Sequence, residues 1–230
     1  MLIKKLSVLI ALLCLVSGLT SCKGTDTSAY QTAKNAVNKF KSAGSYICII
    51  STKQTGGDEA SATNSGDTGS SLLPASETTT PSKVEYQKVS GSIKFLELCG
   101  NDFSKPDTVE YCDGSKLTIT MGNDTQDRKF DGKVPGTPNI ISKSYLKKQK
   151  EVKNGKNTVI TLTFNEGKKG STSSDIHVGD ITSTYYLDSS GMLTEYTIDT
   201  VASLSGQTIH LMDDLNYSNI NEPIDVKQPV

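Results

Sequence analysis

Apolar and polar residues alternate in short runs along most of this 230-residue chain. In one such run, Leu117, Ile119 and Met121 fall on one face of a strand and two threonines fall on the other. A period of two with one polar face is typical of an antiparallel sheet that is wet on one side. The strands predicted in this way are 46–52, 84–89, 93–99, 108–112, 116–121, 144–152, 158–164, 181–187, 192–201 and 207–217.

One amphipathic helix is predicted ahead of the strands. Its apolar residues recur at helical spacing and form a single stripe that consists of Ala29, Ala33, Ala36, Val37 and Phe40. Polar side chains at residues 26–28 can cap the start of this helix, and Gly44 can close its end. We therefore expect a helix from Ser28 to Ala43.

Tight turns separate several of the predicted strands. Asp113 with Gly114 and Asn154 with Gly155 suit two-residue hairpins, and residues 188–191 close another. Consecutive hairpins build an antiparallel meander, and the helix must bury its stripe on that sheet. The predicted fold class is therefore α+β, a curved antiparallel sheet with an N-terminal amphipathic helix packed on one face.

The segment from Gln54 to Ser82 interrupts this pattern. It is rich in Gly, Ser and Thr, and Leu72 and Leu73 are its only large apolar residues. Such a segment buries too little apolar surface to offset its ordering entropy. We expect a disordered polar insertion here, within a single domain that spans residues 29–230.

The N-terminus has the layout of a secretory signal. Two lysines precede an apolar run over residues 6–16, and one apolar and two small residues lead up to Cys22. The run is too short to span a bilayer permanently. The approach to the cysteine resembles the lipobox of bacterial lipoproteins, which implies a signal peptide over residues 1–21 and lipid attachment at Cys22. Residues 22–28 would then be a lipidated tether that holds the protein on the extracytoplasmic face of the cell membrane. An ordinary cleaved signal with a coincidental cysteine is the alternative.

Three cysteines remain after the signal and the proposed anchor. Disulfides persist outside the cytoplasm. Cys99 and Cys112 end successive predicted strands, so we predict a disulfide between them. Cys48 lies in an apolar run and should be buried and unreactive.

Composition and motifs indicate no catalytic chemistry. The formal net charge is −1, so no nucleic-acid partner is expected. His177, expected in a loop, and His210, expected to face away from the apolar side of its strand, have no second ligand at a metal-binding spacing. Asp213 and Asp214 are adjacent on a strand, so their side chains should point to opposite faces. We expect no metal, no cofactor and no enzymatic activity.

The order of lipobox, tether, amphipathic helix and antiparallel strands resembles the LolA-like and LppX-like family of bacterial lipoproteins. The closest likeness is to uncharacterised Gram-positive lipoproteins of that group, at residues 185–188, 193–198 and 217–224 and at Pro229. The resemblance implies a half-open barrel whose concave face, partly plugged by the helix, holds acyl chains or another apolar ligand. It carries over no binding residue by position.

Together, the predicted curvature and this resemblance favour an apolar cavity in the sheet. The candidate lining residues are Phe95, Leu117, Ile119, Phe164 and Ile198. We expect a membrane-anchored protein that binds or carries a lipid or another hydrophobic ligand there. The alternative is a surface-interaction or scaffolding module, which a filled core would favour.

Lysines gather in one predicted hairpin, where Glu151 is the only acidic neighbour. They are Lys143, Lys147, Lys148, Lys150, Lys153 and Lys156. On a lipid-anchored protein they could face anionic headgroups. The other interpretation is that they protect an exposed strand edge from aggregation.

Overall fold

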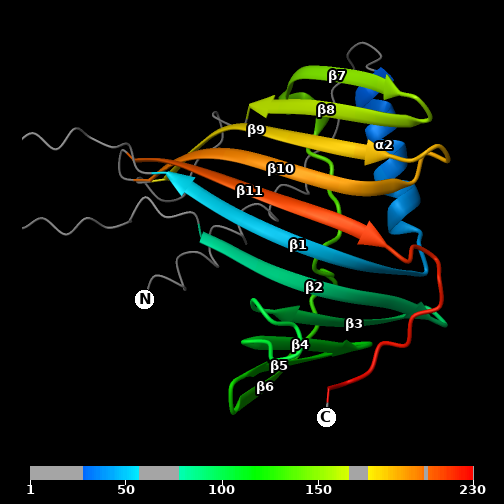
Figure 1. Ribbon diagram of the computed structural model, residues 1–230, viewed down its shortest axis with the longest axis vertical. Coiled ribbons are helices and arrows are strands. Elements are labelled where there is room, and N and C mark those ends of the chain that lie inside the picture. The colour runs from blue at the N-terminus through cyan, green and yellow to red at the C-terminus, as the bar shows by residue number, and fades with distance from the viewer. Residues whose placement is uncertain (1–27, 57–77, 166–175, 205–206, 230) are drawn as a thin grey trace, which may run out of the picture.

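The computed structural model describes residues 28–56, 78–165, 176–204 and 207–229 (Figure 1). They form helix α2 (Ser28–Lys41), a short 3-10 helix η2 (Lys143–Tyr145) and eleven strands in one antiparallel sheet. The strands are β1 (Ser45–Gly56), β2 (Thr78–Val89), β3 (Ser92–Cys99), β4 (Thr108–Asp113), β5 (Lys116–Met121), β6 (Asp124–Lys129), β7 (Leu146–Asn154), β8 (Asn157–Asn165), β9 (Ile176–Leu187), β10 (Leu193–Leu204) and β11 (Gln207–Ser218). The signal peptide and Cys22 lie outside the described residues.

The sheet consists of two antiparallel meanders that meet at its centre. Its strand order is β6-β5-β4-β3-β2-β1-β11-β10-β9-β8-β7, so the first and last strands pair in the middle. Strands β6 and β7 form the two edges of the sheet. Residues 130–142, which we call the crossing segment, connect one edge to the other. In Figure 1 the crossing segment and α2 both lie behind the sheet, on what we call the inner face. Within the described ranges the two edges do not pair, so the sheet is an open antiparallel half-barrel.

Most predicted elements are confirmed, but some of their bounds and the assignment of His177 to a loop are wrong. The helix ends at Lys41, two residues earlier than predicted. Residues 54–56 belong to β1 and residues 78–82 to β2, because the pairing of these strands continues past the predicted ends. The predicted disordered insertion is therefore too long on both sides, and its residues 57–77 lie outside the described residues. His177 lies in strand β9, opposite Ser203, and not in a loop.

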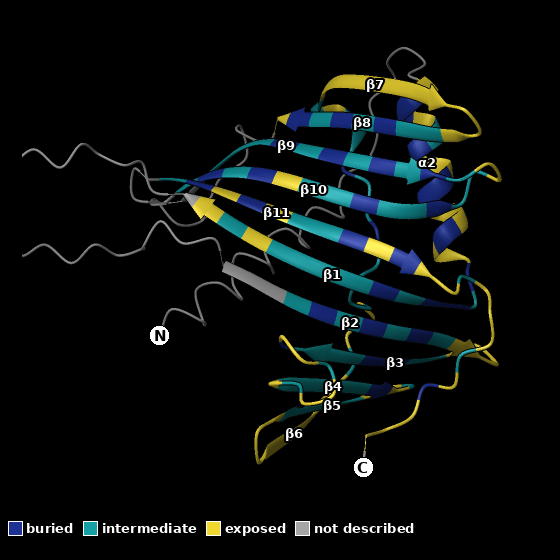
Figure 2. Ribbon diagram, viewed as in Figure 1, coloured by how far each residue is buried: buried dark blue, intermediate teal, exposed yellow. Residues whose placement is uncertain are grey.

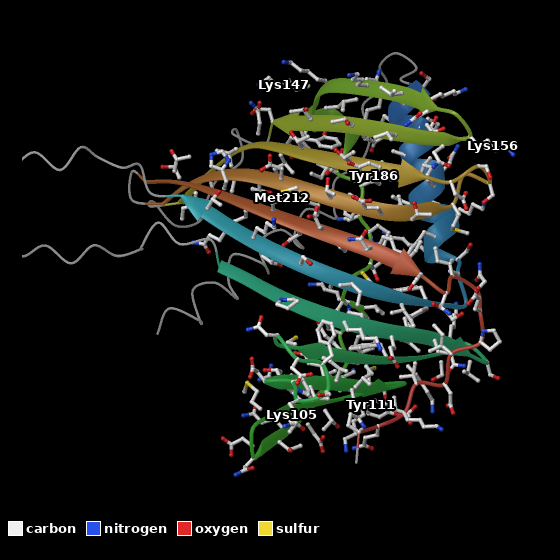
Figure 3. The ribbon with its side chains drawn as sticks, in the orientation of Figure 1. Lys105, Tyr111, Lys147, Lys156, Tyr186 and Met212 are labelled. Atoms are coloured by element: carbon white, nitrogen blue, oxygen red, sulfur yellow. The ribbon has the colours of Figure 1, made fainter. Side chains whose placement is uncertain are left out.

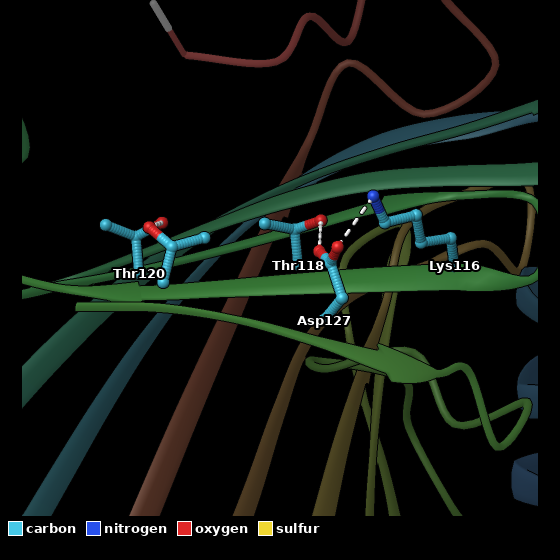
Figure 4. Close-up of polar contacts among 5 residues, drawn as sticks. Lys116, Thr118, Thr120 and Asp127 are labelled. Atoms are coloured by element: carbon cyan, nitrogen blue, oxygen red, sulfur yellow. Dashed lines mark hydrogen bonds and ion pairs between the residues drawn. The ribbon is translucent and has the colours of Figure 1, made fainter.

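Strand β6 escaped prediction because it has no apolar side chain, and all six of its residues are exposed. Polar contacts join it to β5 (Figure 4). The Thr118 hydroxyl donates a hydrogen bond to Asp127 at 2.7 Å, and the Lys116 ammonium lies 2.9 Å from the same carboxylate. The hydroxyls of Thr120 and Thr125 are 3.2 Å apart. Cross-strand polar pairs thus stabilise an edge that hydrophobic patterning does not mark.

The apolar stripe of α2 is buried against the inner face, as the sequence predicted, and Tyr30 is buried with it. Phe40 is 1% exposed, and its ring centre lies 4.9 Å from that of Tyr46 and 4.3 Å from that of Tyr217. Figure 2 shows buried residues along α2 and the central strands, whereas β7 is exposed over nearly its whole length. The main core therefore lies between α2 and the sheet.

Tyrosine hydroxyls fasten the crossing segment to the inner face. Three of them donate to its backbone carbonyls, in the pairs Tyr217 to Gly136 (2.9 Å), Tyr185 to Asn139 (3.0 Å) and Tyr30 to Ile141 (3.0 Å). The hydroxyls of Tyr46 and Thr137 are 3.2 Å apart. These tyrosines come from α2, β1, β9 and β11, so the segment is fixed across the same face that the helix covers.

Replacing Gly136 by alanine is expected to destabilise the protein more than the same change at Gly132, in the same segment. Both glycines have a positive φ, 68° and 89°, so both changes cost about 1–2 kcal/mol of backbone strain. Only at Gly136 does the new Cβ meet a neighbour, Cys48 Sγ at 3.0 Å; nothing lies within 4 Å at Gly132. Urea denaturation should show the larger loss for Gly136→Ala, and Cys48→Ala should cost less in that background than in the wild type. Equal losses at the two glycines would contradict close packing of the crossing segment on β1.

Candidate functional site

Strand register identifies the residues of the inner face. Tyr217 and Tyr185 lie on it because their hydroxyls bond the crossing segment. Alternate residues of a strand share a face, and so do directly opposite residues of antiparallel neighbours. By this register all five predicted lining residues lie on the inner face, namely Phe95, Leu117, Ile119, Phe164 and Ile198.

These five residues fall in two separate regions. Phe95, Leu117 and Ile119 lie on the β1–β6 meander, and the other two lie on the β7–β11 meander. Phe95 and Phe164 are 1% and 0% exposed and belong to the core around α2, so they fill the interior. Leu117 and Ile198 are half-buried against that core, and Ile119 is also half-buried.

Polar side chains surround Ile198 on the inner face. Ser183 of β9 and Asp213 of β11 lie directly opposite it, and Thr200 is the next inner-facing residue of β10. Ser183 and Thr200 are 0% and 3% exposed, and neither hydroxyl has a hydrogen-bond partner in the described part of the chain. A buried polar group without a partner costs about 1–3 kcal/mol. A ligand atom that bonded such a hydroxyl would recover that cost.

Of these two hydroxyls, Thr200 is the clearer case, because Ser183 still interacts with a neighbouring tyrosine. Burial raises the pKa of Tyr196 to about 12, and Ser183 opposes that rise, although the geometry between the two hydroxyls does not meet that of a hydrogen bond. Asp213 does have a partner, because the Thr52 hydroxyl donates to it at 2.7 Å. Burial nevertheless raises the pKa of Asp213, which shows that the carboxyl lies in a poorly hydrated place.

Apolar side chains continue the inner face beyond the core around α2. Ala202, Ile209 and Leu211 are 3%, 4% and 7% exposed, and they are not members of that core cluster. Leu211 lies directly opposite Thr200, and Ile209 lies opposite Ala202. Here the wall is amphipathic, with hydroxyls and one carboxyl set among aliphatic side chains.

A carboxyl pair on the other meander was missed in the sequence. Glu97 of β3 and Glu110 of β4 lie directly opposite each other on the inner face. Burial, and then the charge of Glu110, raise the pKa of Glu97 to about 7, although two hydrogen bonds lower it. Burial also raises the pKa of Glu110, and Arg128 opposes that rise. The signal was the alternation of Glu97 with Phe95, which assigns both residues to the apolar face of one strand.

The predicted disulfide is wrong. Cys99 lies opposite Thr108, whereas Cys112 lies opposite Phe95, so the two cysteines are four residues apart along the paired strands. At about 3.4 Å per residue this offset exceeds the Cα separation of a disulfide. The described cysteines are all free, and Cys48 is 0% exposed as predicted. Burial raises the pKa of the Cys99 thiol to about 12, which suppresses its reactive thiolate form.

Of the other titratable groups that the sequence singled out, Asp214 and His210 lie apart from the inner wall. Asp213 and Asp214 point to opposite faces, as predicted. His210 is exposed on the outer face in an open depression of about 350 Å³, whose other lining residues are Lys53, Thr55, Asp199 and Met212. Among the residues that the structure describes, no group of three or more His, Cys, Asp or Glu side chains could hold a metal ion.

These features define a class of protein, an open antiparallel half-barrel with one helix on its inner face and an amphipathic wall beyond the helix. In the described ranges no helix is both long enough and apolar enough to cross a membrane.

Matches to this chain are found only among solved structures. No protein-family model and no curated protein matches the chain. A LolA superfamily protein from Nitrosomonas europaea matches 86% of this chain and 95% of its own, with a TM-score of 0.33 and 9% identity. A DUF1329 family protein from Desulfovibrio piger matches 87% of this chain and 94% of its own, with a TM-score of 0.34 and 9% identity. At such low TM-scores neither match supports an inference about this chain's function.

Proposed function

We propose that this protein is a membrane-anchored extracytoplasmic lipoprotein that binds a lipid or another hydrophobic ligand on the inner face of its sheet. The observation that carries the proposal is the Thr200 hydroxyl, which is buried in a wall of aliphatic side chains and has no hydrogen-bond partner among the described residues. Apolar walls with a few placed polar groups are typical of ligand sites. Thr200 and Ser183 would bond the polar part of the ligand, and Ile198 and Leu211 would contact its chain.

The charges of the inner face narrow the class of ligand. Asp213 lies on this face directly opposite Ile198, and burial raises the pKa of its carboxyl. A bound carboxylate or phosphate would add like charge beside this poorly hydrated carboxyl, which is unfavourable. We therefore assign a lipid with an uncharged, hydrogen-bonding head, such as a glyceride.

Support for the anchor comes from the N-terminal sequence. Cys22 follows an apolar run and two small residues, and only residues 23–27 separate it from the start of α2. The six residue-to-residue steps from Cys22 to Ser28 span at most about 20 Å when fully extended. The inner face would therefore lie close to the leaflet that holds the anchor, where lipid ligands are present.

The ligand site is tested by the binding of a fluorescent diacylglycerol to the full chain. Ile198→Glu places a charge on the wall beside Asp213, so we expect binding at least 10-fold weaker. Thr197→Glu is the matched control, because Thr197 is the adjacent residue and faces outward, opposite Asp214. Binding should stay within 2-fold there. A folded Ile198→Glu variant that binds as the wild type does would contradict the site.

The Thr200→Val variant tests whether the Thr200 hydroxyl bonds the ligand, because it removes the hydroxyl but keeps the shape of the side chain. If the hydroxyl bonds the ligand, the variant should bind the probe several-fold more weakly while the free protein gains about 1 kcal/mol of stability. A gain in stability with unchanged probe binding would favour the second candidate function.

That second candidate is a scaffolding module with a filled core. The observation in its favour is the complete burial of Phe95 and Phe164, together with the crossing segment held over the inner face. On this reading the half-barrel is a platform, and its loops contact protein partners. It requires that the inner wall bind no lipid, which the same probe measures.

A further inference from the structure

Strand β7 carries an unbalanced positive charge along one edge of the sheet. Eight of its nine residues are exposed. Lys147 is paired with Asp180 at 2.7 Å. Four further exposed lysines on β7 and its turn, which we call the lysine edge, are Lys148, Lys150, Lys153 and Lys156. Figure 3 labels Lys147 and Lys156 near the two ends of this hairpin.

The lysine edge lies beside the start of helix α2. The Tyr30 backbone N–H donates to the Gln149 side-chain oxygen at 3.2 Å, so the first turn of α2 touches β7. In Figure 1 the helix begins behind β7 and runs away from it across the sheet. The start of α2, from which the proposed tether would extend, therefore lies at the β7 end of the sheet. A tether with a reach of about 20 Å keeps this end nearest to the membrane.

We propose that the lysine edge docks on the anionic headgroups of the membrane that holds the anchor. The lysines supply charge complementary to phospholipid phosphates, and their long side chains lie on an exposed edge strand and its turn. Val152, 43% exposed on the same strand, adds an apolar contact. The proposal rests on the proposed anchoring, and it orients the half-barrel with β7 toward the leaflet and β6 away from it.

Lysine acetylation in vesicles tests this orientation with the native, lipidated full chain. The protein is reconstituted into phosphatidylcholine vesicles, with or without one quarter phosphatidylglycerol, and its acetylated lysines are quantified by mass spectrometry. We expect labelling of the lysine edge to fall at least threefold when phosphatidylglycerol is present and to recover in 0.5 M salt. Lys105 and Lys129 are the controls, because they are exposed on the β3–β6 side of the sheet. Their labelling should not change.

Labelling of the lysine edge that is equal in the two kinds of vesicle would overturn the docking proposal. A variant with all four lysines changed to serine adds a second readout: Lys147, the lysine of β7 that it keeps, should lose the fall in labelling that phosphatidylglycerol causes in the wild type. If it aggregates and the wild type shows no phosphatidylglycerol effect, the lysines serve edge protection instead. Failure of the anchor is seen separately, as equal partition of the wild type and Cys22→Ala into detergent.

Discussion

Replacing Phe40 by alanine is expected to lower the free energy of unfolding by about 3–5 kcal/mol, the usual cost of emptying a buried aromatic site. Phe40 is 1% exposed and packs on Tyr46 and Tyr217, with ring centres 4.9 and 4.3 Å away. These two tyrosines also contact the crossing segment. The change therefore loosens the helix and the segment together. Urea denaturation followed by circular dichroism measures the loss.

Lys34→Ala is the matched control for this change. Lys34 lies on the exposed side of the same helix, and alanine is a good helix former, so the free energy of unfolding should stay within about 0.5 kcal/mol. A loss below 1 kcal/mol for Phe40→Ala would mean that α2 does not close the core.

Replacing Glu97 by glutamine is expected to stabilise the protein at pH 8 and to change little at pH 4. Burial and the charge of Glu110 raise the pKa of Glu97 from its ordinary 4.5 to about 7. The folded state then binds more protons than the unfolded state between these values, so stability falls as pH rises through this window. At about 1.4 kcal/mol per pH unit, the ionised carboxyl costs up to about 3 kcal/mol above pH 7. Glutamine removes that cost, and thermal unfolding at the two pH values measures it.

Glu151→Gln is the control for the Glu97 change, because Glu151 is exposed on β7. It should alter the pH dependence of the melting temperature little. If Glu97→Gln destabilised the protein equally at pH 4 and pH 8, the glutamate would be acting through its hydrogen bonds and not through a costly buried charge.

The sequence pattern was sufficient to predict ten of the eleven strands, most of which bury side chains on one face. Strand β6 has no buried face and is held by polar pairs such as Thr118 with Asp127, which leave no periodic signal. The pairing of β1 with β11 at the centre of the sheet joins the two ends of the described chain. Local pattern contains no information on that long-range choice.

The candidate site was predictable only in outline. The sequence named Ile198 and four other residues as the lining of an apolar cavity, and by the strand register all five lie on the inner face. It could not show that Phe95 and Phe164 are enclosed by α2, because that depends on how the helix packs. The disulfide prediction was wrong for a similar reason. Cys99 and Cys112 both end predicted strands, but because the two strands run antiparallel, the cysteines lie four residues apart along the paired strands. That the Thr200 hydroxyl has no hydrogen-bond partner among the described residues is visible only once its neighbours in the fold are known.

Native mass spectrometry before and after organic extraction, on the full chain from a lipid-containing bacterial host, tests the central claim most directly. The account predicts an added mass of an uncharged lipid that extraction removes, whereas the proposed covalent anchor on Cys22 would survive extraction. The extracted lipid should be recovered in much lower amount from Ile198→Glu than from Thr197→Glu. Repeated preparations that carry no extractable lipid, from a protein whose inner wall is intact, would contradict the proposed function.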